Sequence, residues 1–133
     1  MTLYLLDTHI VSKMFLAKPP HLEAIKSKPI TDIGISVVTE AELLYGLQKR
    51  SPSSGLVTAI HLFLRTTEIL AWNSETALAF ARLKVAVQQD GIGIAPLDLM
   101  IAAQALATGA TLVTNDGALK RLGHVLPVED WTA

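Results

Sequence analysis

Residues 96–116 read PLDLMIAAQALATGATLVTND, and the organisation of the rest of the chain can be worked out from this stretch. Apolar residues recur in its first half at helical spacing, and Gly109 is placed to end that helix in the left-handed conformation. The mainly β-branched run at residues 111–114 then predicts a short strand. Asp98 and Asp116 bracket the stretch, with no Lys or Arg between them. The stretch is therefore predicted to be one helix-and-strand unit of an α/β fold with an acid near each end.

The same alternation of short apolar runs and helical patterns continues through the rest of the chain. Four short strands and a possible fifth are predicted, at residues 4–6, 33–36, 67–70, 111–114 and 125–128. Repeated strand and helix without long strand runs predicts a parallel sheet covered by helices on both faces. We expect a single domain that spans residues 1–133.

Three connecting segments have more specific expectations. Pro19 and Pro20 are expected to end the first helix and begin a second short one that carries Leu22 and Ile25. Residues 53–55, Ser-Ser-Gly, are expected to be the most flexible part of the chain. A short basic turn is expected at Lys120 and Arg121, before the last possible strand.

Composition limits the classes of protein to which the chain can belong. Charged residues make up 17% of the 133 residues and the formal net charge is −1, so there is no global positive field for nucleic acid. The absence of cysteine excludes disulfides, thiolate metal sites and a cysteine nucleophile. The N-terminus lacks the basic region of a signal peptide, and the longest charge-free run, residues 99–115, is too short and too polar for a membrane span. We therefore expect a cytoplasmic protein with no membrane segment.

Four acidic residues are notable for their positions, namely Asp7, Glu42, Asp98 and Asp116. Taken singly, Asp7 can be a helix cap, Asp98 a first-turn acid favoured by the helix dipole, and Asp116 part of a turn. Glu42 is harder to explain in this way, because it lies on or beside the apolar face of its helix. The three aspartates all fall at strand ends or helix starts, which places them at the same edge of a parallel sheet.

Carboxylates that gather at one edge repel one another and raise each other's pKa unless a cation lies between them. Oxygen ligands of this kind select Mg²⁺ or Mn²⁺ over zinc, and the chain has neither cysteines nor a paired-histidine motif. Such a site suits the hydrolysis of a phosphodiester bond by a metal-activated water. The pattern thus points to a metal-dependent nuclease.

Four motifs indicate a family resemblance that runs from one end of the chain to the other. They are LLDTHIV at residues 5–11, ISVVTEAELLYGL at 35–47, IAPLDLMIAAQALATGATLVTND at 94–116 and VEDW at 128–131. In these motifs the sequence resembles the PIN-domain ribonucleases, and specifically the VapC-type toxins of toxin–antitoxin pairs. The resemblance implies a PIN-like three-layer sandwich with a short-stranded parallel sheet flanked by helices. It also implies an endoribonuclease that inhibits growth when it is not bound by its antitoxin, and that forms a homodimer.

The same resemblance implies roles for particular residues. Asp7, Glu42, Asp98 and Asp116 would form the acidic site that holds Mg²⁺ or Mn²⁺, with Thr8 and Thr114 as supporting hydroxyls. The sequence departs from the family pattern at His9, where many members have Asn or Ser. It also departs at residues 118–119, where Ala-Leu replaces the Asp-Phe pair that often follows the last motif, which weakens any claim for a fifth acid.

Two other functions remain as alternatives. A catalytically weak member of the fold that only binds nucleic acid or protein would be expected to lack site acids, and all four are present. A phosphotransferase that uses Asp7 as its nucleophile usually has a second acid two residues on, where this chain has His9. Three basic groups are candidates for contacts with RNA phosphates, namely Lys49 with Arg50, Arg82 with Lys84, and Lys120 with Arg121.

Overall fold

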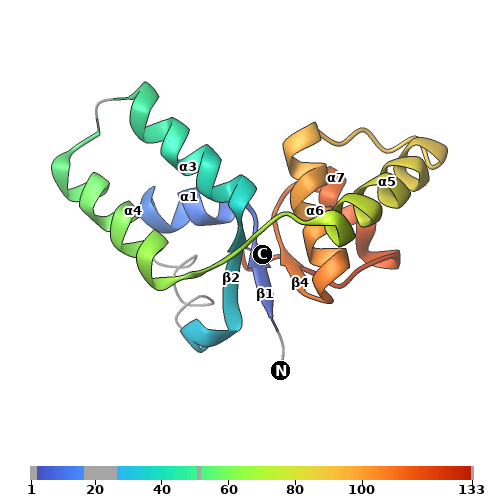
Figure 1. Cartoon of the computed structure of the whole chain (residues 1–133), viewed down its shortest axis with the longest axis horizontal. Coiled ribbons are helices and arrows are strands. Elements are labelled where there is room, and N and C mark those ends of the chain that lie inside the picture. The colour runs from blue at the N-terminus through green and yellow to red at the C-terminus, as the bar shows by residue number, and fades with distance from the viewer. Residues whose placement is uncertain (1–2, 17–26, 51, 133) are drawn as a thin grey trace.

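A parallel β-sheet lies at the centre of the computed structural model, which describes residues 3–16, 27–50 and 52–132 (Figure 1). The described residues form five strands in the spatial order β3-β2-β1-β4-β5, and every neighbouring pair is parallel. The strands are β1 (Tyr4–Leu6), β2 (Ile33–Ser36), β3 (Glu68–Leu70), β4 (Thr111–Val113) and β5 (Val128–Glu129). The predicted parallel sheet is therefore confirmed, although the last strand begins at Val128 rather than at residue 125.

Helices cover both faces of this sheet (Figure 1). One layer contains α1 (Thr8–Leu16), α3 (Val37–Lys49) and α4 (Ser54–Thr66), and the other contains α5 (Ser74–Gln89), α6 (Pro96–Thr108) and α7 (Gly117–Lys120). Successive strand residues point to opposite faces, so Leu5 and Leu6 belong to two different buried clusters. Two hydrophobic cores thus share one sheet, which is the three-layer α/β sandwich that the sequence predicts.

Helix α6 follows its sequence pattern closely. Pro96 occupies the first turn, where its missing N–H costs no hydrogen bond, and Gly109 ends the helix at φ 69° and ψ 22°. Six of its residues are buried, namely Leu99, Ile101, Ala102, Ala103, Gln104 and Ala105. Because α6 packs against α5 as well as against the sheet, its small apolar residues are buried over most of its circumference. This burial fixes the position of Asp98 in the first turn of the helix.

The structure corrects two of the expectations for connecting segments. Residues 53–55 are not a flexible link, because Ser53 caps α4 by accepting a hydrogen bond from the Leu56 N–H, and Ser54 and Gly55 form the first turn. Lys120 and Arg121 do not form a simple turn either, because they join α7 to a 3-10 helix, η2 (Arg121–His124). A further 3-10 turn, η1 (Ile30–Asp32), precedes β2. The predicted helix with Leu22 and Ile25 lies outside the described residues.

The order of the strands creates a special position at the carboxyl ends of β1 and β4. The chain starts at β1, adds β2 and then β3 on one side, and later adds β4 and β5 on the other side. Open α/β sheets bind their ligands where the strand order reverses in this way. Asp7 follows β1 and Asp116 comes shortly after β4, so the fold brings both acids to this position. Within the described residues, no helix is both long enough and apolar enough to cross a membrane.

Candidate active site

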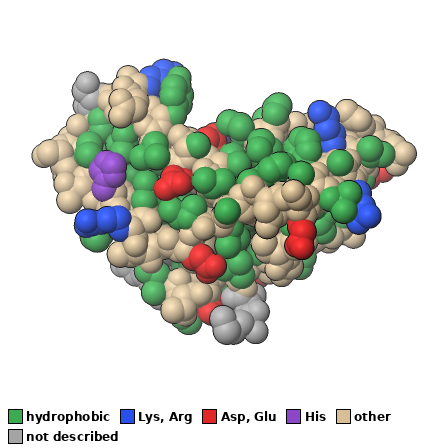
Figure 2. All heavy atoms as spheres, viewed as in Figure 1, with side chains coloured by type: hydrophobic (Ala, Val, Ile, Leu, Met, Phe, Trp, Pro, Cys, Tyr) green, Lys and Arg blue, Asp and Glu red, His purple; other side chains and the backbone are tan. Residues whose placement is uncertain are grey.

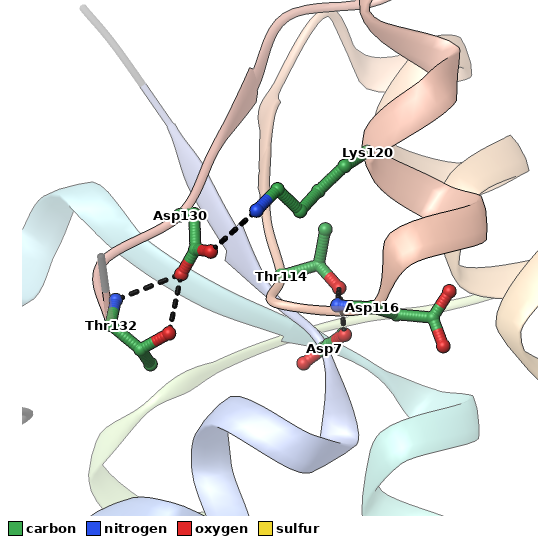
Figure 3. A network of polar contacts seen from close by, with 6 residues as sticks. All are labelled: Asp7, Thr114, Asp116, Lys120, Asp130 and Thr132. Atoms are coloured by element: carbon green, nitrogen blue, oxygen red, sulfur yellow. Dashed lines mark hydrogen bonds and ion pairs between the residues drawn. The ribbon is translucent and has the colours of Figure 1, made fainter.

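Asp7 forms the buried base of the site. It is only 1% exposed, and its Oδ1 accepts a hydrogen bond from the Ile10 N–H at 2.9 Å, so the expected helix cap is present. Its Oδ2 accepts a hydrogen bond from the Thr114 hydroxyl at 2.5 Å (Figure 3). This contact follows from the sheet register. Leu6 of β1 pairs with Val113 of β4, so the residues that follow them, Asp7 and Thr114, are neighbours. Both oxygens of Asp7 are therefore held, one by the start of α1 and the other by the residue that follows β4.

Asp116 lies on the other side of Thr114. Its N–H donates to the Thr114 Oγ1 at 3.0 Å, and its Oδ1 accepts from the Leu119 N–H at 3.0 Å (Figure 3). Asp116 is therefore the N-cap of α7, in place of the turn that its sequence also allowed. A capping carboxylate uses one oxygen for the helix and keeps the other for a ligand. Thr114, which is fully buried, joins the two aspartates through one hydroxyl.

Glu42 reaches the site from α3. Its Oε1 accepts a hydrogen bond from the Thr8 hydroxyl at 2.6 Å, and the Thr8 Oγ1 lies 3.1 Å from the Oγ1 of Thr39. A hydroxyl has one proton, so Thr8 donates to Glu42 and accepts from Thr39. Thr39 is fully buried and lies three residues before Glu42, on the same side of the helix. The two threonines thus hold Glu42 toward the start of α1.

Asp98 completes the group from the first turn of α6. Burial raises the pKa of Asp98, and the charges of Asp116, Asp7 and Glu42 raise it further. Burial also raises the pKa of Asp7, although the hydrogen bonds from Thr114 and Ile10 oppose this effect. Asp98 therefore lies within electrostatic range of the other three predicted acids, and Asp7 within range of Asp116.

The neighbourhood offers these carboxylates little positive charge. Among the described residues, the ion pairs join Lys120 to Asp130 and His124 to Asp90, and neither pair includes one of the four acids. On the face shown in Figure 2, basic side chains lie toward the edge of the molecule and most acidic side chains lie nearer its middle. Within the described residues, the four carboxylates therefore lack the ion-paired basic side chain that would normally accompany buried or half-buried acids.

A cleft of about 580 Å³ opens beside the acids. One side is formed by Thr8, His9, Ser12 and Lys13 of α1 together with Glu42, and the other by residues 95–98 at the start of α6. A smaller hollow of about 140 Å³ lies between α1, α3 and α4, and it shares Thr8, Ser12 and Glu42 with the cleft. The remaining lining of the hollow is mainly apolar and includes Phe15, Leu43, Leu47, Leu56 and Ile60.

The oxygen atoms of this site match the ligand preferences of Mg²⁺ and Mn²⁺. As they stand, no three histidine, aspartate or glutamate side chains in the described parts of the chain converge closely enough to hold a metal ion. Glu42 and Asp98 line the cleft, and hydrogen bonds from the protein orient Asp7, Glu42 and Asp116. A divalent cation in that space would remove the mutual repulsion that raises the pKa of Asp98.

Sequence reasoning missed three residues that belong to the site. Thr39 supports Thr8, while Ser12 and Lys13 line the cleft. Helical spacing was the available signal, because Ser12 and Lys13 lie four residues after Thr8 and His9 and must share their side of α1.

None of the three basic groups predicted to contact RNA lines the acidic cleft. Lys120 is bound to Asp130, Arg50 borders the smaller hollow, and Arg82 lies at a shallow depression with Leu106 on the other helical layer.

Comparisons with known proteins agree with this geometry. A family model described as PIN domain matches residues 4–125. The chain is 31% identical to Ribonuclease VapC2 of Rickettsia felis over 97% of this chain and 98% of the relative. It is 26% identical to the tRNA(fMet)-specific endonuclease VapC of Salmonella typhimurium over 98% of this chain and 99% of that protein. Among solved structures, VapBC2 from Rickettsia felis bound to a promoter DNA fragment matches with a TM-score of 0.84 and 27% identity, covering 98% of this chain and 99% of the matched chain.

Proposed function

The chain belongs to the PIN-domain family, and from this premise we propose that it is the ribonuclease toxin of a toxin–antitoxin pair. The site of RNA cleavage is the group formed by Asp7, Glu42, Asp98 and Asp116. The observation that supports this assignment best is that four carboxylates, two of which line an open cleft, have no ion-pair partner among the described residues. A purely structural cluster of acids would be expected to have such a partner.

The activity is proposed to depend on Mg²⁺ or Mn²⁺. When bound, the metal activates a water molecule for attack on the phosphodiester and neutralises charge on the leaving oxygen. The hydroxyl of Thr114 and the N–H of Ile10 hold the Asp7 carboxylate in a fixed orientation. Thr8 does the same for Glu42 on the opposite side of the site. Hydrogen bonds from outside the ligand set thus orient Asp7 and Glu42, and the acidic side chains need only draw closer together to hold a cation.

The cleft admits the RNA backbone from the side of α1 and α6. A phosphodiester is negatively charged and would be repelled by the bare acids, so binding of substrate and of metal must support each other. The ionisation of Asp98 should be the most sensitive to a bound metal, since its pKa is raised by burial and by all three of its acidic neighbours.

An antitoxin protein is the expected partner, since the solved structure from Rickettsia felis is of a VapBC2 assembly. We infer that the antitoxin covers the apolar hollow between α1, α3 and α4, next to the cleft. Several large apolar side chains are also exposed, including Tyr45 at 62% and Val85 at 54%. These side chains provide apolar surface for the proposed homodimer, which light scattering of the purified chain would detect.

The test is RNA cleavage by the purified full chain. We expect cutting of RNA with Mg²⁺ or Mn²⁺ and no cutting with EDTA, and tRNA(fMet) is the first substrate to try because the Salmonella relative is specific for it. Sequencing of RNA ends after induced expression would identify the cleavage site. Cleavage that continues in EDTA would refute the metal dependence, and complete absence of cleavage on total RNA would favour a binding module instead.

A further inference from the structure

Helix α1 turns a face with two basic residues toward the cleft. Thr8, His9, Ser12 and Lys13 all line it, and the spacing of four residues places Thr8 above Ser12 and His9 above Lys13. Thr8 is engaged with Glu42, whereas His9 is exposed and Lys13 is half-buried. The acids and the basic side chains therefore border the same space.

Neither basic side chain is neutralised by the described part of the protein. The ion pairs found there involve Lys120 and His124 and not Lys13 or His9. His9 lines the cleft together with Glu42 and Asp98, and it lies two residues after Asp7 in the first turn of α1. Lys13 lies one helical turn further from the acids, toward the outer part of the cleft.

The opposite side of the cleft differs in character. Ala95, Pro96 and Leu97 form it, and Leu97 is 46% exposed although it is a large apolar residue. The cleft thus has carboxylates at its base, cations along α1 and an apolar surface at the start of α6. A nucleotide has matching parts, because its phosphates are anionic and its base presents an apolar face.

We propose that Lys13, with His9 beside it, binds the RNA phosphate next to the scissile phosphate, and that the intervening nucleoside packs against Pro96 and Leu97. This inference rests on the proposed ribonuclease function and deepens it by naming the residues that position the substrate. The bare carboxylates cannot attract a phosphate, so a flanking phosphate needs a cation supplied by the protein. Lys13 and His9 are the basic residues that line the cleft.

The proposal predicts a specific salt dependence. Each phosphate contact made by a lysine contributes a slope of roughly −0.7 to the dependence of log affinity on log salt for single-stranded nucleic acid. Replacing Lys13 should weaken RNA binding to a similar degree for all sequences and reduce the magnitude of that slope by about one contact. In the cleavage reaction the loss should appear in KM rather than in kcat, because Lys13 holds a phosphate that does not react.

The experiment measures binding of a labelled single-stranded RNA and of tRNA(fMet) by the full chain, at several salt concentrations, in an Asp98→Asn background that prevents cutting. Lys13→Ala is compared with Arg65→Ala, a control because Arg65 is an exposed basic residue of α4 that does not line the cleft. We expect Lys13→Ala to lower affinity roughly three- to tenfold and to flatten the salt slope, while Arg65→Ala does neither. Adding His9→Ala should weaken binding further, and Leu97→Ser should weaken it with no change in slope.

An unchanged slope in Lys13→Ala, or an equal change in Arg65→Ala, would overturn the inference. Circular dichroism of each variant establishes that a loss of binding is not a loss of folding. The proposed ribonuclease function is tested separately, by measuring RNA cleavage with the protein in which Asp98 is intact. If that protein cuts RNA but the salt slope does not change in Lys13→Ala, only the proposed phosphate subsite is wrong. Absence of cutting would instead refute the ribonuclease proposal itself.

Discussion

Two neighbouring groups of polar residues at the carboxyl edge of the sheet differ in whether their carboxylates are paired with a cation (Figure 3). Asp130 is neutralised, because Lys120 lies 2.8 Å away and the side chain and backbone of Thr132 both donate to it. Burial disfavours its ionised form, but these donors outweigh that effect and lower the pKa of Asp130 to about 2. Asp7 and Asp98 lack such a cation, and burial raises the pKa of both.

The difference shows how one edge of the fold can hold both a structural and a functional acid. Lys120 belongs to α7, the helix that Asp116 caps, so a lysine lies close in sequence to the acidic site. Asp130 binds that lysine and thereby keeps its charge at the C-terminal segment (Figure 3). We interpret Asp130 as a structural residue that holds residues 128–132 against α7. The unpaired acids are interpreted as ligands that remain available for a metal.

The strongest test of the comparison exchanges the acids of the two groups for amides. Asp7→Asn or Asp98→Asn should reduce RNA cleavage by about a thousandfold or more, because each removes a proposed metal ligand. Asp130→Asn should leave cleavage close to that of the unchanged protein. Initial rates with Mn²⁺ measure the effect, and similar rates for Asp98→Asn and Asp130→Asn would break the distinction.

A smaller effect is expected from the threonines that serve each group. Thr114→Val removes the hydroxyl that orients Asp7 and binds the Asp116 N–H, so cleavage should fall roughly 10- to 100-fold. Thr132→Val is the matched control, since it removes a hydroxyl from Asp130 instead. The comparison uses the same cleavage assay, and equal losses in the two variants would show that the role of Thr114 is not specific to the site.

The paired acid should matter more for stability than for cleavage. Asp130→Asn is expected to lower the free energy of unfolding by about 1 kcal/mol, a value that allows for the solvent exposure of Lys120. Lys120→Ala should cost a similar amount, and the double variant should cost less than the sum because the two residues share one interaction. Urea unfolding measures these values, and strict additivity would argue against the ion pair.

The two groups should also respond oppositely to pH. The pKa of Asp130 is lowered on folding, so its stabilising effect is present above its ordinary value of 3.8 and is lost as the pH falls toward about 2. The pKa of Asp98 is raised, so its ionised form destabilises the metal-free fold, and this cost disappears as the pH falls through the raised pKa toward 3.8. Asp98→Asn should therefore be more stable than the unchanged chain at neutral pH, with a difference that shrinks on acidification. A stability difference that stays constant with pH would contradict the assignment.

Much of this arrangement could be predicted from the sequence, because it depends on local patterns. Pro96 and Gly109 mark the ends of α6, and the β-branched run after Gly109 forms β4, so Asp98 and Asp116 are placed by signals close to them in the chain. The position of Asp7 follows from its short buried strand. The resemblance to VapC-type proteins supplied the grouping of these acids with Glu42, which comes from a separate helix.

Other features depend on contacts that sequence patterns do not report. The pairing of Lys120 with Asp130 joins residues ten apart across the end of the sheet, and a basic turn was expected there instead. Ser53 caps a helix where a flexible link was expected, because its neighbours pack in the first turn of α4. Helical spacing places Lys13 on the same side of α1 as His9, but the residues that form the opposite side of the cleft come from α6 and are known only from the structure.

The most direct test of the account is thermal unfolding of the full chain with and without Mn²⁺. A ligand at roughly 100 times its Kd stabilises the folded state by about 2.7 kcal/mol, so a bound metal should raise Tm by several degrees. We predict this shift for the unchanged protein and for Asp130→Asn, and a much smaller shift for Asp98→Asn. An equal Mn²⁺ shift in all three proteins, or none in any of them, would contradict the claim that the unpaired carboxylates form the metal site.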